Sequence, residues 1–96
     1  MSTAAIESIS NHHERAVWEA VRAMSTRYPL LDDEDLLADI ACVALNRLPP
    51  RYIRHEVDYL FYLTDKERHE NDRAIGEAVT FAFEFVQARV AMRARG

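Results

Sequence analysis

Four polar side chains that can bind a nucleotide surround a pair of prolines in the middle of the chain. They are Asn46, Arg47, Arg51 and Tyr52, on either side of Pro49-Pro50. An arginine presents a planar fork of donors, which suits phosphate oxygens or the Hoogsteen edge of guanine. A tyrosine ring stacks on purines, and an asparagine amide can read a base edge or cap a helix. These residue types predict a site for a planar or phosphorylated ligand.

The same stretch also has a purely structural interpretation. Pro50 lacks an N–H and disfavours helical backbone at Pro49, so the preceding helix must end near Leu48. Because two rings fix φ, the corner is stiff and would lose little entropy when a ligand binds. It could equally be a plain helix stop, with Arg51 paired to an acid and Tyr52 packed in the core. Composition alone leaves both interpretations open.

Other polar groups predict no metal site. His55 lies near Glu56 and Asp58, but the spacing matches no metal motif, and this group is better interpreted as a polar rim. His12 and His13 are adjacent, and adjacent side chains on a helix point about 100° apart. Both therefore cannot readily bind one metal ion.

Signatures of catalysis are absent from the sequence. The only glycines are Gly76 and Gly96, so there is no phosphate-binding glycine loop. No serine stands in the context of a nucleophile elbow, and the acid pairs lie at predicted helix starts, where capping explains them. We expect a binding protein without a cofactor and not an enzyme.

The composition predicts one small folded domain over residues 1–96. The chain is 49% hydrophobic and contains only two glycines and three prolines, which is typical of a helix-rich domain. Its net charge of −4 argues against binding to nucleic acid or to acidic membranes.

The chain carries the features of a cytoplasmic protein. Cys42 is the only cysteine, which excludes an intramolecular disulfide and fits a reducing compartment. We expect Cys42 to be a buried packing residue. Residues 1–10 have neither the charge nor the apolar run of a signal peptide, and are expected to form a flexible arm. No run reaches the roughly 20 apolar residues that a membrane span needs.

Hydrophobic periodicity predicts an all-α fold, a small bundle of three main helices. The first runs from Asn11, a good N-cap, to about Arg27. The second begins at Asp32-Asp33, where acidic residues favour a helix start. Its apolar residues cover so wide an arc that a central position is expected. The third runs from about Asp65 to Ala94, after a capping box.

The connector after the prolines, residues 52–63, is ambiguous. It alternates as a strand would, yet helical spacing fits it as well. No partner for a strand is visible elsewhere in the sequence, so a short helical or extended connector is expected.

The third helix predicts a homodimer. One apolar stripe, which includes Ile75, Val79 and Phe83, accounts for packing within the chain. Phe81, Phe85 and Met92 lie off that stripe. A second apolar surface on one helix indicates an interface with another copy.

The stretch DIACVALNRLPPRY, residues 39–52, resembles the signature of the ComFB (late competence development) family. Asn11, Glu14 and Val17 resemble the family's N-terminal helix, and the resemblance extends to about Leu63. Some members carry a cysteine cluster suited to zinc before the second helix. Residues 30–36 contain no cysteine here, so the chain resembles the type without that cluster.

The resemblance implies a function for the corner, because similar proteins are receptors for cyclic dinucleotide second messengers. It favours Asn46, Arg47, Arg51 and Tyr52 as a ligand site, with cyclic di-GMP foremost, and a relay of binding to an unknown protein partner. The alternative is a dimeric adaptor without a ligand that binds another protein through its acidic surface.

Overall fold

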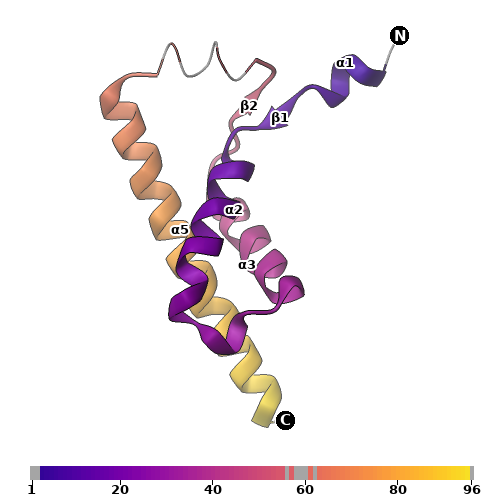
Figure 1. Ribbon diagram of the computed structural model, residues 1–96, viewed down its shortest axis with the longest axis vertical. Helices are drawn as coiled ribbons and strands as arrows, with labels where there is room; N and C mark the ends of the chain where they lie inside the picture. The colour runs from indigo at the N-terminus through magenta and orange to yellow at the C-terminus, as the bar shows by residue number, and fades with distance from the viewer. Residues whose placement is uncertain (1–2, 56, 58–60, 62, 96) are drawn as a thin grey trace.

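The computed structural model describes residues 3–55, 57, 61 and 63–95. Its body consists of three long helices, α2 (His13–Met24), α3 (Glu34–Arg47) and α5 (Asp65–Arg95). Figure 1 shows α2 and α3 side by side against the middle of α5. This arrangement confirms the prediction of an all-α bundle with three main helices.

The core lies where the apolar faces of the three helices meet. Val17 and Val21 of α2 are fully buried, and Tyr28 stacks on Phe83 with ring centroids 4.6 Å apart. The core residues from the second half of the chain are Leu37, Ile40, Ala41, Ala44, Leu48, Ile75, Ala78, Val79, Ala82, Phe83 and Val86. The predicted stripes of all three helices therefore face inward, because burying them removes apolar surface from water.

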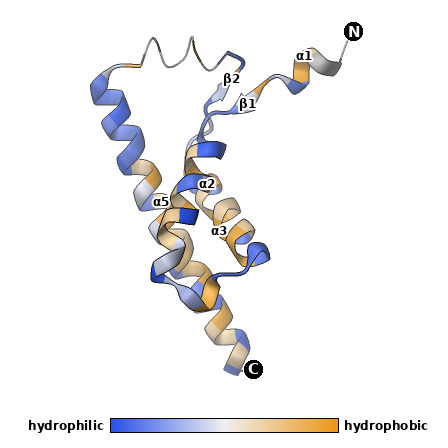
Figure 2. Cartoon of the chain, in the orientation of Figure 1, coloured by the Kyte–Doolittle hydropathy of each residue, from blue (hydrophilic) through white to orange (hydrophobic). Residues whose placement is uncertain are grey.

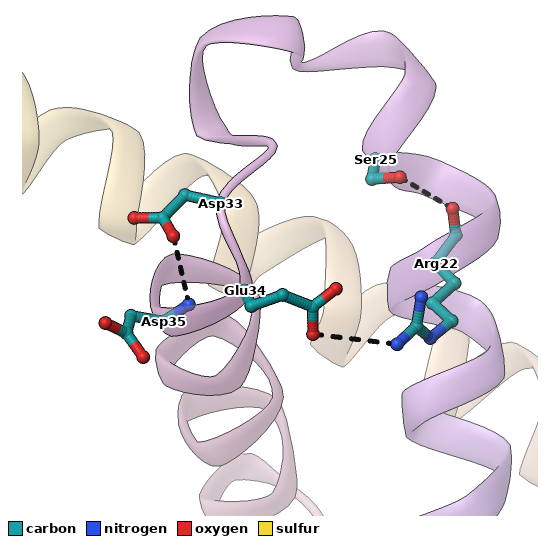
Figure 3. Close-up of polar contacts among 5 residues, drawn as sticks. All are labelled: Arg22, Ser25, Asp33, Glu34 and Asp35. Carbon is teal, nitrogen blue, oxygen red and sulfur yellow. Dashed lines mark hydrogen bonds and ion pairs between the residues drawn. The ribbon is translucent and has the colours of Figure 1, made fainter.

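Two short 3₁₀ helices and an acidic cap connect α2 to α3. The 3₁₀ helices are η1 (Ser25–Arg27) and η2 (Pro29–Leu31), so helical backbone reaches the predicted end of the first helix. Asp33 caps α3 by accepting a hydrogen bond from the Asp35 N–H at 3.3 Å (Figure 3). Arg22 forms an ion pair with Glu34 at 3.6 Å.

The N-terminal part of α5 extends away from this core. Its first buried residue is Ile75, and all residues of the helix before it are exposed or half-buried. Figure 2 shows this part of α5 as largely hydrophilic, whereas the middle of the helix is hydrophobic. The change in hydropathy along α5 explains why its middle turns, and not its first turns, pack against α2 and α3.

A small antiparallel ladder joins the N-terminal arm to the connector. Helix α1 (Thr3–Glu7) leads to strand β1 (Ser10–Asn11), which pairs with β2 (Tyr52–Ile53). Asn11 lies opposite Tyr52. The sequence indicates only a flexible arm over residues 1–10, so the strand partner that could not be seen in the sequence comes from the end of this arm.

The rest of the connector is described only in part. Val57 and Phe61 have helical backbone, whereas Tyr52 and Ile53 are extended, so both halves of the prediction apply. The prediction for the connector also covers residues 56, 58–60 and 62, which lie outside the described residues. The polar group of His55, Glu56 and Asp58 falls partly among them.

The prediction that Cys42 is buried is wrong. The side chain is exposed, and its Sγ accepts a hydrogen bond from Asn46 Nδ2 at 3.6 Å. The buried face of α3 follows Leu37, Ile40 and Ala44, and a residue two positions before Ala44 points to another side of the helix.

Candidate functional site

The two prolines set a bend that is anchored in the core. Leu48, the C-cap of α3, is extended with φ −102° and ψ 138° and is 7% exposed. The chain that follows is bound to the start of α2 at Arg51. Its backbone N–H donates to Asn11 Oδ1 at 3.0 Å, and its carbonyl accepts from the His12 N–H at 2.6 Å.

Asn11 therefore connects two distant segments through one side chain. The same Oδ1 that accepts from Arg51 also accepts from the His13 N–H at 3.2 Å, at the first turn of α2. An amide oxygen has two lone pairs, so it can hold both bonds at once. The prediction that Asn11 is the N-cap is wrong, because the N-cap of α2 is His12, which makes no side-chain cap hydrogen bond. The Asn11 side chain instead contacts the His13 N–H and the bend, 40 residues away in sequence.

One groove runs between α2 and α3 beside the bend, and we call it the α2–α3 groove. Its volume is about 650 Å³, and its lining includes Glu14, Trp18, Cys42, Asn46, Pro50 and Tyr52. Tyr52 is 68% exposed and Trp18 is half-buried, with the Arg22 guanidinium 4.6 Å from the centroid of the Trp18 ring. The groove combines two aromatic rings with an amide, which suits a planar polar ligand.

A second groove lies on the other side of the bend, against α5, and we call it the α5 groove. Its volume is about 370 Å³, and it is lined by His13, Leu48, Pro49, Pro50, Arg51, Glu67, Glu70, Asn71 and Ala74. The lining therefore includes several charged or polar side chains: two acids, an arginine, a histidine and an amide.

His13 is the most buried polar residue of this region. It is 7% exposed, and within the described part of the chain its Nδ1 has no hydrogen-bond partner. Burial lowers the pKa of His13 below its ordinary value, and the positive charges of His12 and Arg51 lower it further. The ring is therefore held preferentially in its neutral form.

The four residues predicted as one site do not share one groove. Asn46 and Tyr52 line the α2–α3 groove, whereas Arg51 lines the α5 groove. Arg47 lies over the Phe81 ring, with its Cζ 3.8 Å from the ring centroid. Successive side chains diverge by about 100° on a helix and point to opposite sides of an extended chain, which separates each arginine from its neighbour.

Sequence reasoning overlooked two contributors to this region. Trp18 received no role from the sequence, although its half-buried ring lines the α2–α3 groove from outside the buried face of α2. Asn11 carried a recognisable cap pattern, but its contact with Arg51 joins residues too far apart to be read from local spacing.

The described residues form neither a metal site nor a membrane span. Among residues 3–55, 57, 61 and 63–95, no three His, Cys, Asp or Glu side chains come together as a metal site. Within the same ranges, none of the helices combines the length and apolar character of a membrane span.

Comparison with known proteins places the chain in a family. A family model described as "Late competence development protein ComFB" matches residues 10–90. The matched range contains α2, α3, most of α5 and all residues that line the two grooves. No curated protein and no solved structure matches the chain. The chain belongs to the ComFB family.

Proposed function

We propose that this protein is a cytoplasmic receptor that binds a cyclic dinucleotide, with cyclic di-GMP foremost, and relays binding to a protein partner. The observation that carries the proposal is the α2–α3 groove, where Trp18, Asn46 and Tyr52 meet beside a rigid bend. Membership of the ComFB family supports the same assignment. The protein would act by binding and not by catalysis.

Each part of the groove has a role in this proposal. One base of the ligand stacks on Tyr52, and stacking of a base on an aromatic side chain contributes about 1–3 kcal/mol. The Asn46 amide binds a polar edge of the ligand, which displaces its weak bond to Cys42. The phosphates lie over the bend, within reach of the Arg51 guanidinium.

The bend also offers a route from ligand to partner. Tyr52 belongs to β2, which pairs with β1, and Arg54 Nε donates to Ser8 Oγ at 3.0 Å at the end of α1. A ligand that binds only one arrangement of this ladder shifts the arm toward that arrangement. Ile6 and Ile9 are 59% and 48% exposed and give the arm an apolar surface for a partner.

A calorimetric titration tests the proposal. Cyclic di-GMP, cyclic di-AMP and linear nucleotides are first screened by thermal shift, and the ligands that raise the melting temperature are then titrated. We expect Tyr52→Ala and Arg51→Ala each to weaken cyclic di-GMP binding at least about tenfold. The melting temperature should stay almost unchanged, because both side chains are exposed.

Leu30→Ala is the matched control, since Leu30 is 92% exposed and lies outside both grooves. Its affinity should equal that of the unchanged protein. If no nucleotide raises the melting temperature at high micromolar concentration, the receptor proposal is wrong and the adaptor without a ligand takes its place. The exposed rings of Phe81 and Phe85 favour that second function.

A further inference from the structure

The two grooves beside the bend share a wall. Leu48 and Pro50 line both of them, so the proline bend forms a ridge between the α2–α3 groove and the α5 groove. A cyclic dinucleotide has two bases joined by one ring of sugars and phosphates. Such a ligand can place one base on each side of a ridge while its phosphates lie across the top.

The α5 groove presents carboxylates that are available to a ligand. Glu67 is half-buried and Glu70 is exposed, and both come from the first turns of α5. Among the described residues, neither carboxylate takes part in an ion pair. An ionised carboxylate can only accept hydrogen bonds, so this side of the groove favours a ligand edge made of donors.

The histidine in the same groove adds hydrogen-bonding capacity that the described protein groups do not use. His13 is 7% exposed and lines the groove, and its Nδ1 has no partner in the described part of the chain. A buried polar atom without a partner costs stability. The neutral His13 ring can also lie against a planar ligand without adding a charge to the groove.

We propose that the α5 groove is a second base subsite, in which Glu67 and Glu70 recognise the donor edge of guanine. This inference rests on the proposed receptor function. Guanine presents N1–H and the N2 amino group side by side, and both can donate to carboxylates. Adenine presents its N6 amino group beside a bare N1 lone pair at the corresponding edge, so it offers one donor position there and a lone pair that a carboxylate repels. The groove therefore favours cyclic di-GMP over cyclic di-AMP, because a site built for two adjacent donors disfavours a base that offers one donor beside a lone pair.

The test compares the two ligands on the full chain by calorimetry. In the double variant Glu67→Gln with Glu70→Gln, we expect cyclic di-GMP to bind at least about tenfold more weakly. The preference for cyclic di-GMP over cyclic di-AMP should shrink as well, because a glutamine amide both donates and accepts and pairs well with adenine. Glu84→Gln is the control, since Glu84 is exposed on the same helix and lies outside the groove.

The outcomes separate this inference from the receptor function. If the unchanged protein binds neither dinucleotide, the receptor function fails and the subsite with it. If the unchanged protein binds cyclic di-GMP, and the double variant keeps both its affinity and its preference, the receptor function stands and the subsite is overturned. Equal weakening for both dinucleotides would also overturn it, because the acids would then not distinguish the bases.

Discussion

His13 shows how one buried side chain couples folding to pH. Burial and the charges of His12 and Arg51 lower its pKa below the ordinary value of 6.5, so the folded protein favours the neutral ring. In the unfolded chain the ring binds a proton as the pH falls below 6.5. The contribution of His13 to stability is therefore complete above that pH and is lost as the pH falls through it.

The lowered pKa of His13 leads to a prediction for the stability of the protein at different pH values. We expect the free energy of unfolding to fall between pH 7 and about 5, and to fall less steeply in His13→Gln, which cannot take up the proton. Urea denaturation at each pH measures it. Leu30→Ala is the control, because Leu30 is 92% exposed and carries no titratable group, so the slope should stay unchanged. A slope in His13→Gln equal to that of the unchanged protein would contradict the assignment.

The four residues of the predicted site show how much a local sequence pattern can predict. Asn46 and Tyr52 were predicted together and do line one groove. Arg47 and Arg51, predicted beside them, lie over Phe81 and in the other groove. The residue types predict a ligand-binding chemistry, which stays a prediction, whereas side-chain direction depends on whether the backbone at each position is helical or extended.

At the scale of secondary-structure elements, the Asn11 side chain connects β1 to the start of α2 and to the proline bend through two hydrogen bonds. Asn11→Ala removes the acceptor used by the Arg51 and His13 N–H groups. A net hydrogen bond contributes about 0.5–1.5 kcal/mol, so we expect a loss of about 1–2 kcal/mol in the free energy of unfolding. Because the bend would then be less well positioned, cyclic di-GMP binding should weaken as well. Urea denaturation and calorimetry measure the two effects.

Asn11→Asp is the matched control for this element. It keeps a side-chain oxygen at the same place, and a carboxylate oxygen can accept hydrogen bonds from both N–H groups. We expect it to retain most of the stability that Asn11→Ala loses. An Asn11→Ala protein with unchanged stability and unchanged amide exchange at Arg51 would show that these hydrogen bonds do not stabilise the protein.

At the scale of the whole molecule, α5 exposes aromatic and apolar side chains on its surface. Phe81 and Phe85 are 37% and 46% exposed and stack with centroids 5.9 Å apart, and Met92 further along α5 is 72% exposed. Arg47 covers Phe81, and Arg89 lies near Phe85 and forms an ion pair with Asp39 at 3.5 Å. A mixed surface of aromatic rings and arginines is typical of protein interfaces.

The homodimer stays a prediction, and solution mass tests it. We expect light scattering coupled to size exclusion to give a dimer at micromolar concentration, and Phe81→Ser with Phe85→Ser to give a monomer. Leu30→Ser is the control, because it removes an exposed apolar side chain from outside this surface. A monomer mass for the unchanged protein would count against the interface, and the aromatic surface would then need another partner.

The sequence by itself determined the three helices, the caps of α3 and α5 and the inward-facing apolar residues, since these depend on periodicity and on contacts within a few residues. It also determined the place of the bend, because proline acts on its own backbone. Tertiary structure alone decided the strand partner of Tyr52, the exposure of Cys42 and the division of the predicted site between two grooves. Those features depend on which distant surfaces meet when α2 and α3 pack on α5. The local spacing of residues in the sequence does not predict that packing.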